Sequence, residues 1–392
     1  MIFGSIADTR RRMRVRRLAR AVTVEDLREL ARRRVPRAVF DFIDGGSGDE
    51  VTLRANRDGF QDWALVPRVA VDVAQRSSRT TILGRPAALP LVLAPTGLAG
   101  LFWPGGEIEA ARAAAAAGIP FCLSTNSVAS VEEVAQAVPD AERWFQLYPL
   151  RDRGLMQDLL QRAAGAGFGT LCMTLDLPVQ GRRERDLRNA FAVPFRPRLS
   201  TLLDLARRPG FLTGLSRAPV RFGNFGSPGG QAPVSVAQHV GTLFDPSANW
   251  DDVHRIRQDW PGRFVAKGIL HPDDGRRAAE LGADAVIVSN HGGRQLDGAP
   301  AAVRALSGVI KAIDGRGEVI LDGGVRRGTD ILKAIALGAS ACMIGRAFLW
   351  GLAAGGQAGV ARAIDILADE LDNAMALLGI SSLNSLHPDH LA

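Results

Sequence analysis

The feature that most constrains the fold is a series of short, continuously apolar segments that alternate with stretches of helical spacing. Strands that helices cover on both faces are expected to be uninterrupted apolar runs of this kind. Eight such runs occur within roughly 260 residues, at 89–94, 120–123, 144–147, 170–175, 264–267, 285–288, 319–321 and 341–344. This pattern predicts an α/β protein with a parallel sheet.

Stretches rich in Ala, Leu and Glu separate most of these runs, and they predict helices at 107–117, 131–137, 155–164, 273–281 and 330–337. Gly118, Gly282 and Gly338 follow three of them, where a helix often ends in a residue that tolerates positive φ. Eight strands with intervening helices fit a (β/α)₈ TIM barrel, and a doubly wound sheet is the alternative. Glycine loops after the seventh and eighth strands favour the barrel.

Three segments lie outside the repeat. An N-terminal helical preface is predicted at about 23–45, with Thr23 as N-cap of a helix at 24–33, and a C-terminal helix at 357–378. A long insertion at 195–248, rich in Pro, Gly and Arg, follows the fourth strand and contains an apolar run at 211–215. A loop of this length is usually functional or disordered. The predicted division is a basic N-terminal extension, 1–22, and a barrel domain, 23–392.

Composition limits the class of protein. Of 392 residues, 46% are hydrophobic, which excludes a mainly disordered chain. The three cysteines lie singly in apolar runs, so we expect core thiols in a reducing compartment and no metal site. No apolar stretch reaches the roughly 20 residues that span a membrane. The first residues turn polar and then basic, unlike a signal peptide. We therefore expect a cytoplasmic protein that is soluble or attached to a membrane surface.

Charge is unevenly distributed. The formal net charge is +7, yet residues 1–37 hold twelve Arg against four acidic residues, and 182–221 hold ten against three. The chain has only three Lys, so a bias toward Arg explains the residue type but not the clustering. Two basic segments on an acidic body predict an anionic partner. Nucleic acid is an alternative partner, but the sequence contains no recognition module, and we do not expect nucleic-acid binding.

The most specific motif is Ser289-Asn290-His291-Gly292-Gly293-Arg294-Gln295-Leu296-Asp297, directly after the sixth predicted strand. In a barrel this is the C-terminal face, where active sites are built. His291 is suited to act as a general base near neutral pH, and Arg294 to hold a carboxylate. Asp176 ends the fourth strand and would orient the histidine.

Other strand ends also carry candidate residues. The segment Gly181-Arg182-Arg183-Glu184 offers a candidate second arginine for the carboxylate, and Lys267 ends the fifth strand as a charge stabiliser. Glycine-rich loops with Arg follow the last two strands, at 321–328 and 344–346. Backbone N–H groups of such loops bind phosphate beside a helix N-terminus. Two loops at these two places predict a phosphate-binding site.

With these motifs, the sequence resembles the FMN-dependent α-hydroxy-acid dehydrogenase/oxidase family, which includes glycolate oxidase, L-lactate dehydrogenase and mandelate dehydrogenase. The resemblance runs from about residue 23 to 390 and implies a (β/α)₈ barrel with FMN across its mouth. It implies that His291 is the catalytic base, Asp176 its partner, Arg183 and Arg294 the carboxylate ligands, and Tyr148 a contact of the substrate hydroxyl. The implied FMN contacts are Pro95, Thr96, Gly97, Ser124, Gln146, Thr174, Lys267, Asp322, Gly324, Arg326, Gly345 and Arg346.

The sequence departs from the family pattern at Phe42, where a carboxylate-binding tyrosine is usual, and Tyr148 is the chain's single tyrosine. Gly97 is similar to the membrane-associated dehydrogenases, since the oxidases usually have Ala there. The insertion also resembles that of the lactate dehydrogenases, and in the mandelate enzyme this region anchors the protein to the membrane. Phe42 lacks the tyrosine hydroxyl, so an FMN enzyme on a modified substrate, one that lacks a carboxylate, stays an alternative.

Taken together, the resemblance implies oxidation of a lactate- or mandelate-like L-2-hydroxy acid to the 2-oxo acid. Electrons would pass to quinone at the inner face of the cell membrane, in a homotetramer whose basic segments contact anionic lipid. A hydrogen-peroxide-forming oxidase is the alternative on the same fold.

Overall fold

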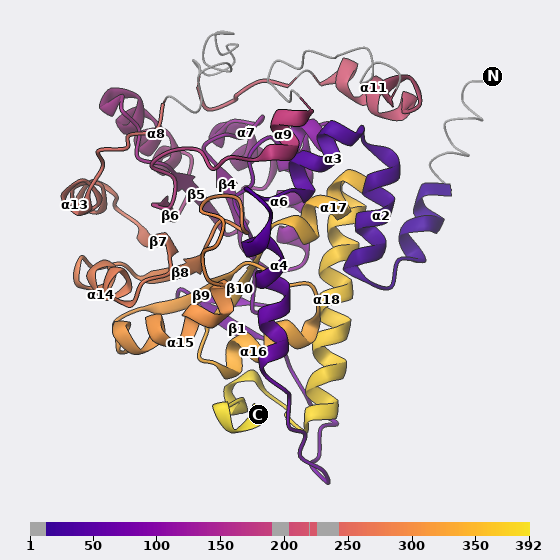
Figure 1. The fold of residues 1–392 in the computed structure, drawn as a ribbon, viewed down its shortest axis with the longest axis vertical. Helices are drawn as coiled ribbons and strands as arrows, with labels where there is room; N and C mark the ends of the chain where they lie inside the picture. Colours follow the sequence, from indigo (N-terminus) through magenta and orange to yellow (C-terminus); the bar gives the residue numbers. More distant parts are fainter. Residues whose placement is uncertain (1–12, 190–203, 219, 226–242) are drawn as a thin grey trace.

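The computed structural model describes residues 13–189, 204–218, 220–225 and 243–392, and within them eight parallel strands close into a barrel (Figure 1). The strand order around the barrel is β10-β3-β4-β5-β6-β7-β8-β9. Their bounds are Leu91–Leu93 (β3), Phe121–Ser124 (β4), Arg143–Leu147 (β5), Thr170–Thr174 (β6), Arg263–Ile269 (β7), Ala285–Ser289 (β8), Glu318–Asp322 (β9) and Ala341–Ile344 (β10). Each of the eight predicted runs overlaps one of these strands, and the ends differ by at most two residues, so the predicted (β/α)₈ barrel is confirmed.

Helices connect most of the strands and cover the outside of the barrel (Figure 1). They are α6 (Gly106–Ala116), α7 (Val131–Ala137), α8 (Arg153–Gly165), α13 (Trp250–Asp259), α14 (Pro272–Glu280), α15 (Ala302–Ile313) and α16 (Gly328–Ala336). The predicted left-handed glycines are confirmed, with φ of 63° at Gly118, 80° at Gly282 and 106° at Gly338. The three cysteines are buried and free, as predicted.

Side chains alternate along each strand, and the inward set fills the barrel. One apolar cluster contains Val92, Cys122, Trp144, Cys172, Val265, Ile287, Ile320 and Met343. The same cluster includes Ile82, Leu83 and Ala87 of a hairpin, β1 (Thr80–Ile82) and β2 (Arg85–Ala87), which closes one end of the barrel. The sequence analysis missed this hairpin because its three-residue strands are too short to give a periodic pattern.

The inward-facing side chains change from apolar to polar toward the carboxyl ends of the strands. Two residues beyond the apolar cluster, the same face presents Ser124, Gln146, Thr174, Lys267, Ser289 and Asp322. These polar side chains are buried, with Lys267 only 3% exposed. Because buried polar groups require partners, a polar layer at one end of an apolar barrel indicates a binding site there.

The N-terminal preface consists of α2 (Val24–Arg34) and α3 (Arg37–Asp44). Thr23 caps α2 in a reciprocal capping box with Asp26, as its position predicted. The preface packs on α17 (Arg346–Gly355), which follows β10, and the predicted C-terminal helix is α18 (Gln357–Leu378). Leu18 is buried and Arg362 donates to the carbonyl of Ala21, so the described part of the basic extension packs against the body. A boundary at residue 22 stays a prediction.

Much of the predicted insertion lies outside the described residues. Its described part contains α11 (Pro209–Arg217), and α9 (Glu184–Arg188) lies just before it in sequence. Asp204 accepts from the backbone N–H of Arg37 at 2.6 Å, and Arg208 donates to the carbonyl of Arg32 at 3.0 Å. The start of α11 is therefore attached to the preface, close to α3 (Figure 1). Among the described helices, none is long and apolar enough to cross a bilayer.

Candidate active site

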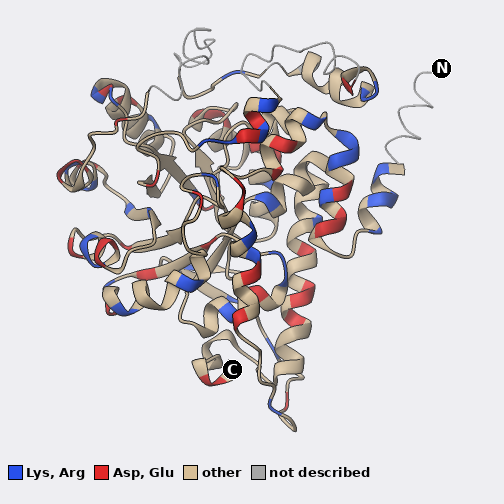
Figure 2. Cartoon of the chain, in the orientation of Figure 1, with Lys and Arg blue, Asp and Glu red and all other residues tan. Residues whose placement is uncertain are grey.

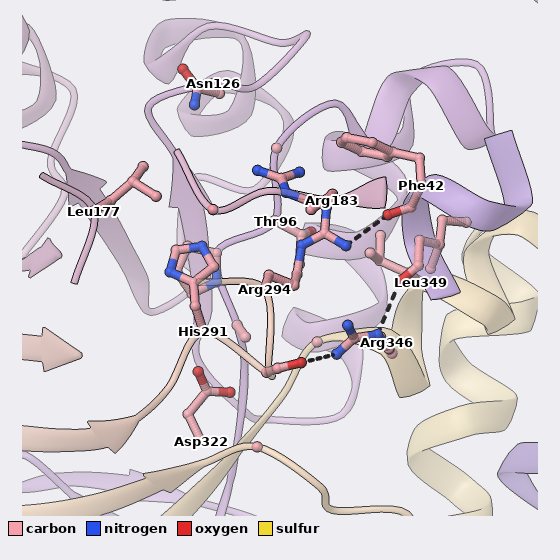
Figure 3. Close-up of a pocket in the computed structure, with 18 of the residues that line it drawn as sticks. Phe42, Thr96, Asn126, Leu177, Arg183, His291, Arg294, Asp322, Arg346 and Leu349 are labelled. Carbon is pink, nitrogen blue, oxygen red and sulfur yellow. Dashed lines mark hydrogen bonds between the residues drawn. The ribbon is translucent and has the colours of Figure 1, made fainter. Parts of the chain in front are cut away.

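A cavity of about 960 Å³ opens at the carboxyl ends of the barrel strands (Figure 3). Most of the predicted site residues line it: Phe42, Pro95, Thr96, Gly97, Tyr148, Arg183, Lys267, His291, Arg294, Asp322, Gly324, Arg326, Gly345 and Arg346. Four do not. Ser124, Gln146 and Thr174 belong to the buried polar layer, and Asp176 lies beside His291. The structure thus brings together residues that are far apart in sequence.

The loop after β8 holds His291 in a conformation that few side chains adopt. His291 has φ 59°, and Gly292 and Gly293 follow with φ of 64° and 73°. A β-carbon on Gly292 would lie 2.6 Å from Arg346 Nη1, and one on Gly293 2.6 Å from the backbone nitrogen of Leu53. The positive φ makes a side chain strained at both positions, and at Gly293 a side chain would also collide with the backbone of Leu53. A non-glycine residue with positive φ occurs often at functional sites, where surrounding contacts maintain the strain.

His291 and Asp176 form a partly buried pair in which Nδ1 and Oδ1 are 2.9 Å apart. Burial would raise the pKa of Asp176, but His291 and then Lys267 offset this and hold the pKa below its ordinary value. Asp176 is therefore a carboxylate at neutral pH. It accepts a hydrogen bond from Nδ1 and so fixes the orientation of the imidazole, as in other carboxylate–histidine pairs.

Lys267 lies at the centre of the polar layer. Its Nζ is 2.8 Å from Asp322 Oδ2 and 3.1 Å from Ser289 Oγ, and Ser289 donates to Asp322 at 2.7 Å. Burial alone would lower the pKa of Lys267, but the carboxylates of Asp322 and Asp176 raise it above its usual value. Lys267 is thus a fixed cation at the base of the cavity.

Two members of the polar layer have buried polar atoms without a partner among the described residues. Gln146 Oε1 accepts from Ser124 and Thr125, while Gln146 Nε2 makes no hydrogen bond. Thr174 Oγ1 is also unpartnered. Because such atoms are costly, their presence beside a fixed cation fits a planar polar ring such as that of FMN. The residues present therefore fit the predicted cofactor.

Two arginines carry the phosphate-binding character at the other side of the cavity. Arg346 begins α17 and donates to the carbonyls of Ile43, Gly45 and Gly292 (Figure 3). Arg326 donates to its neighbouring carbonyl of Val325, and its Nε is buried without a partner. Burial lowers the pKa of Arg326 to about 9 and that of Arg346 to about 10. Two partly buried guanidinium groups beside a helix N-terminus, neither of which forms an ion pair with a described residue, fit a phosphate group.

A second pair of arginines surrounds Phe42. Its ring centroid is 5.8 Å from the Arg183 guanidinium and 5.1 Å from that of Arg294 (Figure 3). Arg294 donates to the carbonyls of Phe42 and Gly45, and burial lowers the pKa of Arg294 well below its usual value. Burial also lowers the pKa of Arg183, whose Nε is unpartnered. This pair is suited to bind an organic carboxylate.

Tyr148 completes the cavity wall between these arginines and the histidine. Its ring stacks at 6.5 Å from that of His291, with an interplanar angle of 19°. Burial, followed by the charge of Asp176, raises the pKa of Tyr148 to about 12. Tyr148 is therefore a neutral phenol whose hydroxyl is able to donate one hydrogen bond to a ligand.

Three contributing residues were not predicted. The Ser289 hydroxyl forms hydrogen bonds with Lys267, Asp322 and the backbone N–H of His291. Ser289 is the first residue of the quoted motif, but no role was predicted for it. Asn290 exchanges hydrogen bonds of 2.8 Å with Asn56. Asp186, three residues after Arg183, also lines the cavity. The only sequence clue for all three was proximity to a recognised motif.

A closed parallel barrel with a phosphate-type site, a fixed cation under a polar layer and a histidine–carboxylate pair defines a flavin-dependent oxidoreductase. A model of the FMN-dependent dehydrogenase family matches residues 31–392, and the chain belongs to this family, which binds FMN.

Relatives extend over nearly the whole chain. It is 44% identical over 377 residues to a putative L-lactate dehydrogenase of Mycobacterium tuberculosis, covering 96% of this chain and 90% of the relative. It is 46% identical over 372 residues to an L-lactate dehydrogenase of Caulobacter vibrioides, with 94% and 96% coverage. Among solved structures, the monotopic membrane protein (S)-mandelate dehydrogenase has a TM-score of 0.91 and 39% identity, covering 95% of this chain and 99% of its own.

Proposed function

We propose that this protein uses FMN to oxidise an L-2-hydroxy acid to the corresponding 2-oxo acid. The observation that carries the proposal is one cavity that His291, Arg183, Arg294 and Lys267 all line, with Asp176 hydrogen-bonded to the histidine. A base, a carboxylate clamp and a fixed cation are the three groups that this oxidation needs. Relatives named L-lactate dehydrogenase and (S)-mandelate dehydrogenase support the same substrate class.

In this proposal each side chain has a separate task. Arg183 and Arg294 bind the substrate carboxylate, and Tyr148 donates to the substrate hydroxyl. His291 removes a proton, from the hydroxyl or the α-carbon, and Asp176 stabilises the imidazolium that forms. FMN, when bound, accepts the two electrons of the oxidation. Lys267 stabilises the negative charge that this electron transfer brings to the base of the cavity.

The apolar part of the cavity wall favours a substrate with a bulky apolar substituent. Leu177, Phe222 and Phe244 line the cavity, and the rings of Phe244 and Tyr148 are 4.7 Å apart. Phe42 adds a further apolar surface where the family usually has a tyrosine. We therefore expect aromatic or branched 2-hydroxy acids to be oxidised with higher kcat/KM than L-lactate, because apolar surface stabilises bound substrate by about 25 cal/mol per Å² buried.

Quinone is the proposed electron acceptor, on the basis of Gly97. A β-carbon at this position would lie 3.2 Å from Asn126 Cβ, so even alanine would crowd the cavity wall. The test is anaerobic reduction followed by reoxidation with a soluble quinone or with air. Fast reoxidation by quinone supports a dehydrogenase, whereas equally fast reoxidation by air would favour the oxidase.

Attachment to an anionic membrane surface is proposed from charge. Five arginines of the N-terminal segment and of the residues just before α11 are exposed: Arg16, Arg17, Arg20, Arg33 and Arg207. Figure 2 shows Lys and Arg side by side with acidic residues along the N-terminal helices. Each basic residue near an anionic surface contributes about 1 kcal/mol, and salt screens the attraction. Cosedimentation with anionic vesicles should fall with salt and on deletion of 200–235. Negligible binding of the intact chain at low salt would refute the attachment.

We also propose a homotetramer in the cytoplasm, at the inner face of the membrane. Sedimentation equilibrium of the detergent-free protein tests the assembly, and a monomer at micromolar concentration would contradict it.

The direct test of the catalytic assignment is His291→Ala, with His254→Ala as the matched control. His254 is an exposed histidine on α13 that contacts Gln258. His291→Ala should keep bound FMN but lose flavin reduction by about 10²–10⁴-fold, the usual contribution of a general base. Near-normal reduction in His291→Ala would refute the role of this histidine.

A further inference from the structure

Helix α9 places a carboxylate in the cavity wall beside the arginine pair. Asp186 lines the cavity, and its Oδ2 is 3.7 Å from Arg183 Nη1. At this distance the two groups form an ion pair, but they are too far apart for a hydrogen bond. In the described part of the chain, no hydrogen bond reaches either the Asp186 carboxylate or the Arg183 guanidinium. The Asp186 carboxylate and the Arg183 guanidinium therefore attract each other without sharing a hydrogen bond.

The charged groups around Asp186 come from three elements. Arg294 in the loop after β8, Arg183 directly before α9 and Arg185 on α9 attract its charge, while Asp41 on α3 repels it. Burial nevertheless raises the pKa of Asp186 above its ordinary value.

Two of these neighbours are already committed to other partners. Arg185 pairs with Asp44 at 3.1 Å and with Glu50, and Asp41 accepts from Asn189 at 2.8 Å. Asp186 is thus the carboxylate in the cavity wall whose charge is balanced by Arg183 and Arg294.

We propose that Asp186 is a built-in counter-carboxylate of the Arg183–Arg294 pair, which makes the cavity select ligands with one negative charge over ligands with two. The proposal rests on the proposed function, because it takes this arginine pair as the site of the substrate carboxylate. Two guanidinium groups and one carboxylate leave a single positive charge for an incoming ligand to neutralise. A second ligand carboxylate would face Asp186, and like charges in a poorly hydrated site repel strongly.

This reasoning predicts how affinity changes when the charge of Asp186 is removed. In Asp186→Asn, each negative charge on a ligand escapes one repulsion. The logarithm of the affinity gain should therefore be about twice as large for a dianion as for a monoanion. At an effective dielectric constant near 20, a gain of about tenfold for the monoanion and about hundredfold for the dianion is expected.

Oxamate and oxalate are suitable probes because they have nearly the same size and differ by one charge. The FMN-loaded wild type and Asp186→Asn would be titrated with each, and binding followed by the flavin absorbance change and, independently, by equilibrium dialysis. The matched control is Glu184→Gln, which removes the same charge from α9 at a side chain that pairs with Arg188. Glu184→Gln should leave the ratio of oxamate to oxalate affinity within about twofold of wild type.

The outcomes separate this proposal from the proposed function. An Asp186→Asn variant with an unchanged affinity ratio, or with weaker binding of both probes, overturns the counter-charge role. Should Asp186→Asn fail to fold, Asp186→Glu provides the test, since it restores the charge and should keep the preference for oxamate. Loss of that preference in a folded Asp186→Glu variant contradicts the proposal. If neither probe binds wild type in either measurement, the arginine pair is not a carboxylate site and the proposed function fails instead.

Discussion

Replacing Asp176 with asparagine isolates the charge of the histidine–carboxylate pair. The side chain keeps its size, and its amide oxygen can still accept from His291 Nδ1, which lies 2.9 Å from Oδ1 in the native pair. What is lost is the negative charge that stabilises the imidazolium. A hydrogen bond to a charged group contributes about 1.5–3 kcal/mol. Flavin reduction by substrate should therefore slow by about 10- to 100-fold.

The assay is anaerobic stopped-flow absorbance of bound FMN at saturating L-2-hydroxy acid. Asp273→Asn is the matched control, because Asp273 lies 3.7 Å from His271 in an exposed pair whose residues do not line the cavity. The FMN bound to this control variant should be reduced at the wild-type rate. Suppose that Asp176→Asn binds FMN and that its FMN is also reduced at a rate within about threefold of wild type. This carboxylate then does not stabilise the imidazolium, and the reasoning is refuted.

Three further predictions concern the cavity and the preface. Phe42→Tyr should tighten L-lactate binding about tenfold if its hydroxyl reaches the carboxylate, since charge-assisted hydrogen bonds are strong; an unchanged KM for every acid tested would contradict this. Arg326→Gln should weaken FMN binding by about tenfold or more in equilibrium dialysis, and full retention of FMN would argue against its phosphate role. Asp44→Asn should lower the free energy of unfolding by about 3 kcal/mol at pH 7 in urea, because it leaves Arg28 without its buried partner. Burial would raise the pKa of Asp44, but Arg28 holds it below its ordinary value, so this contribution should disappear as pH falls below about 4.

The sequence predicted the barrel because strands covered on both faces leave an unmistakable apolar pattern, as at β5 and β8. It also placed His291, Asp176 and Lys267 at strand ends, and the barrel topology then brings strand ends together. It missed the β1–β2 hairpin because three residues show no period. It missed the counter-charge position of Asp186, since an acidic residue on a short helix looks like solvated surface until the fold turns it toward two arginines.

Anaerobic bleaching of the bound flavin tests the central claim most directly. The purified wild-type protein, carrying FMN, would be mixed without oxygen with matched L and D enantiomers of lactate, mandelate and a branched 2-hydroxy acid. The account predicts that the L enantiomers bleach the flavin, fastest for the aromatic or branched acids, and that an equivalent amount of 2-oxo acid forms. Flavin that stays oxidised with every L-2-hydroxy acid, in protein that still binds FMN, would contradict it.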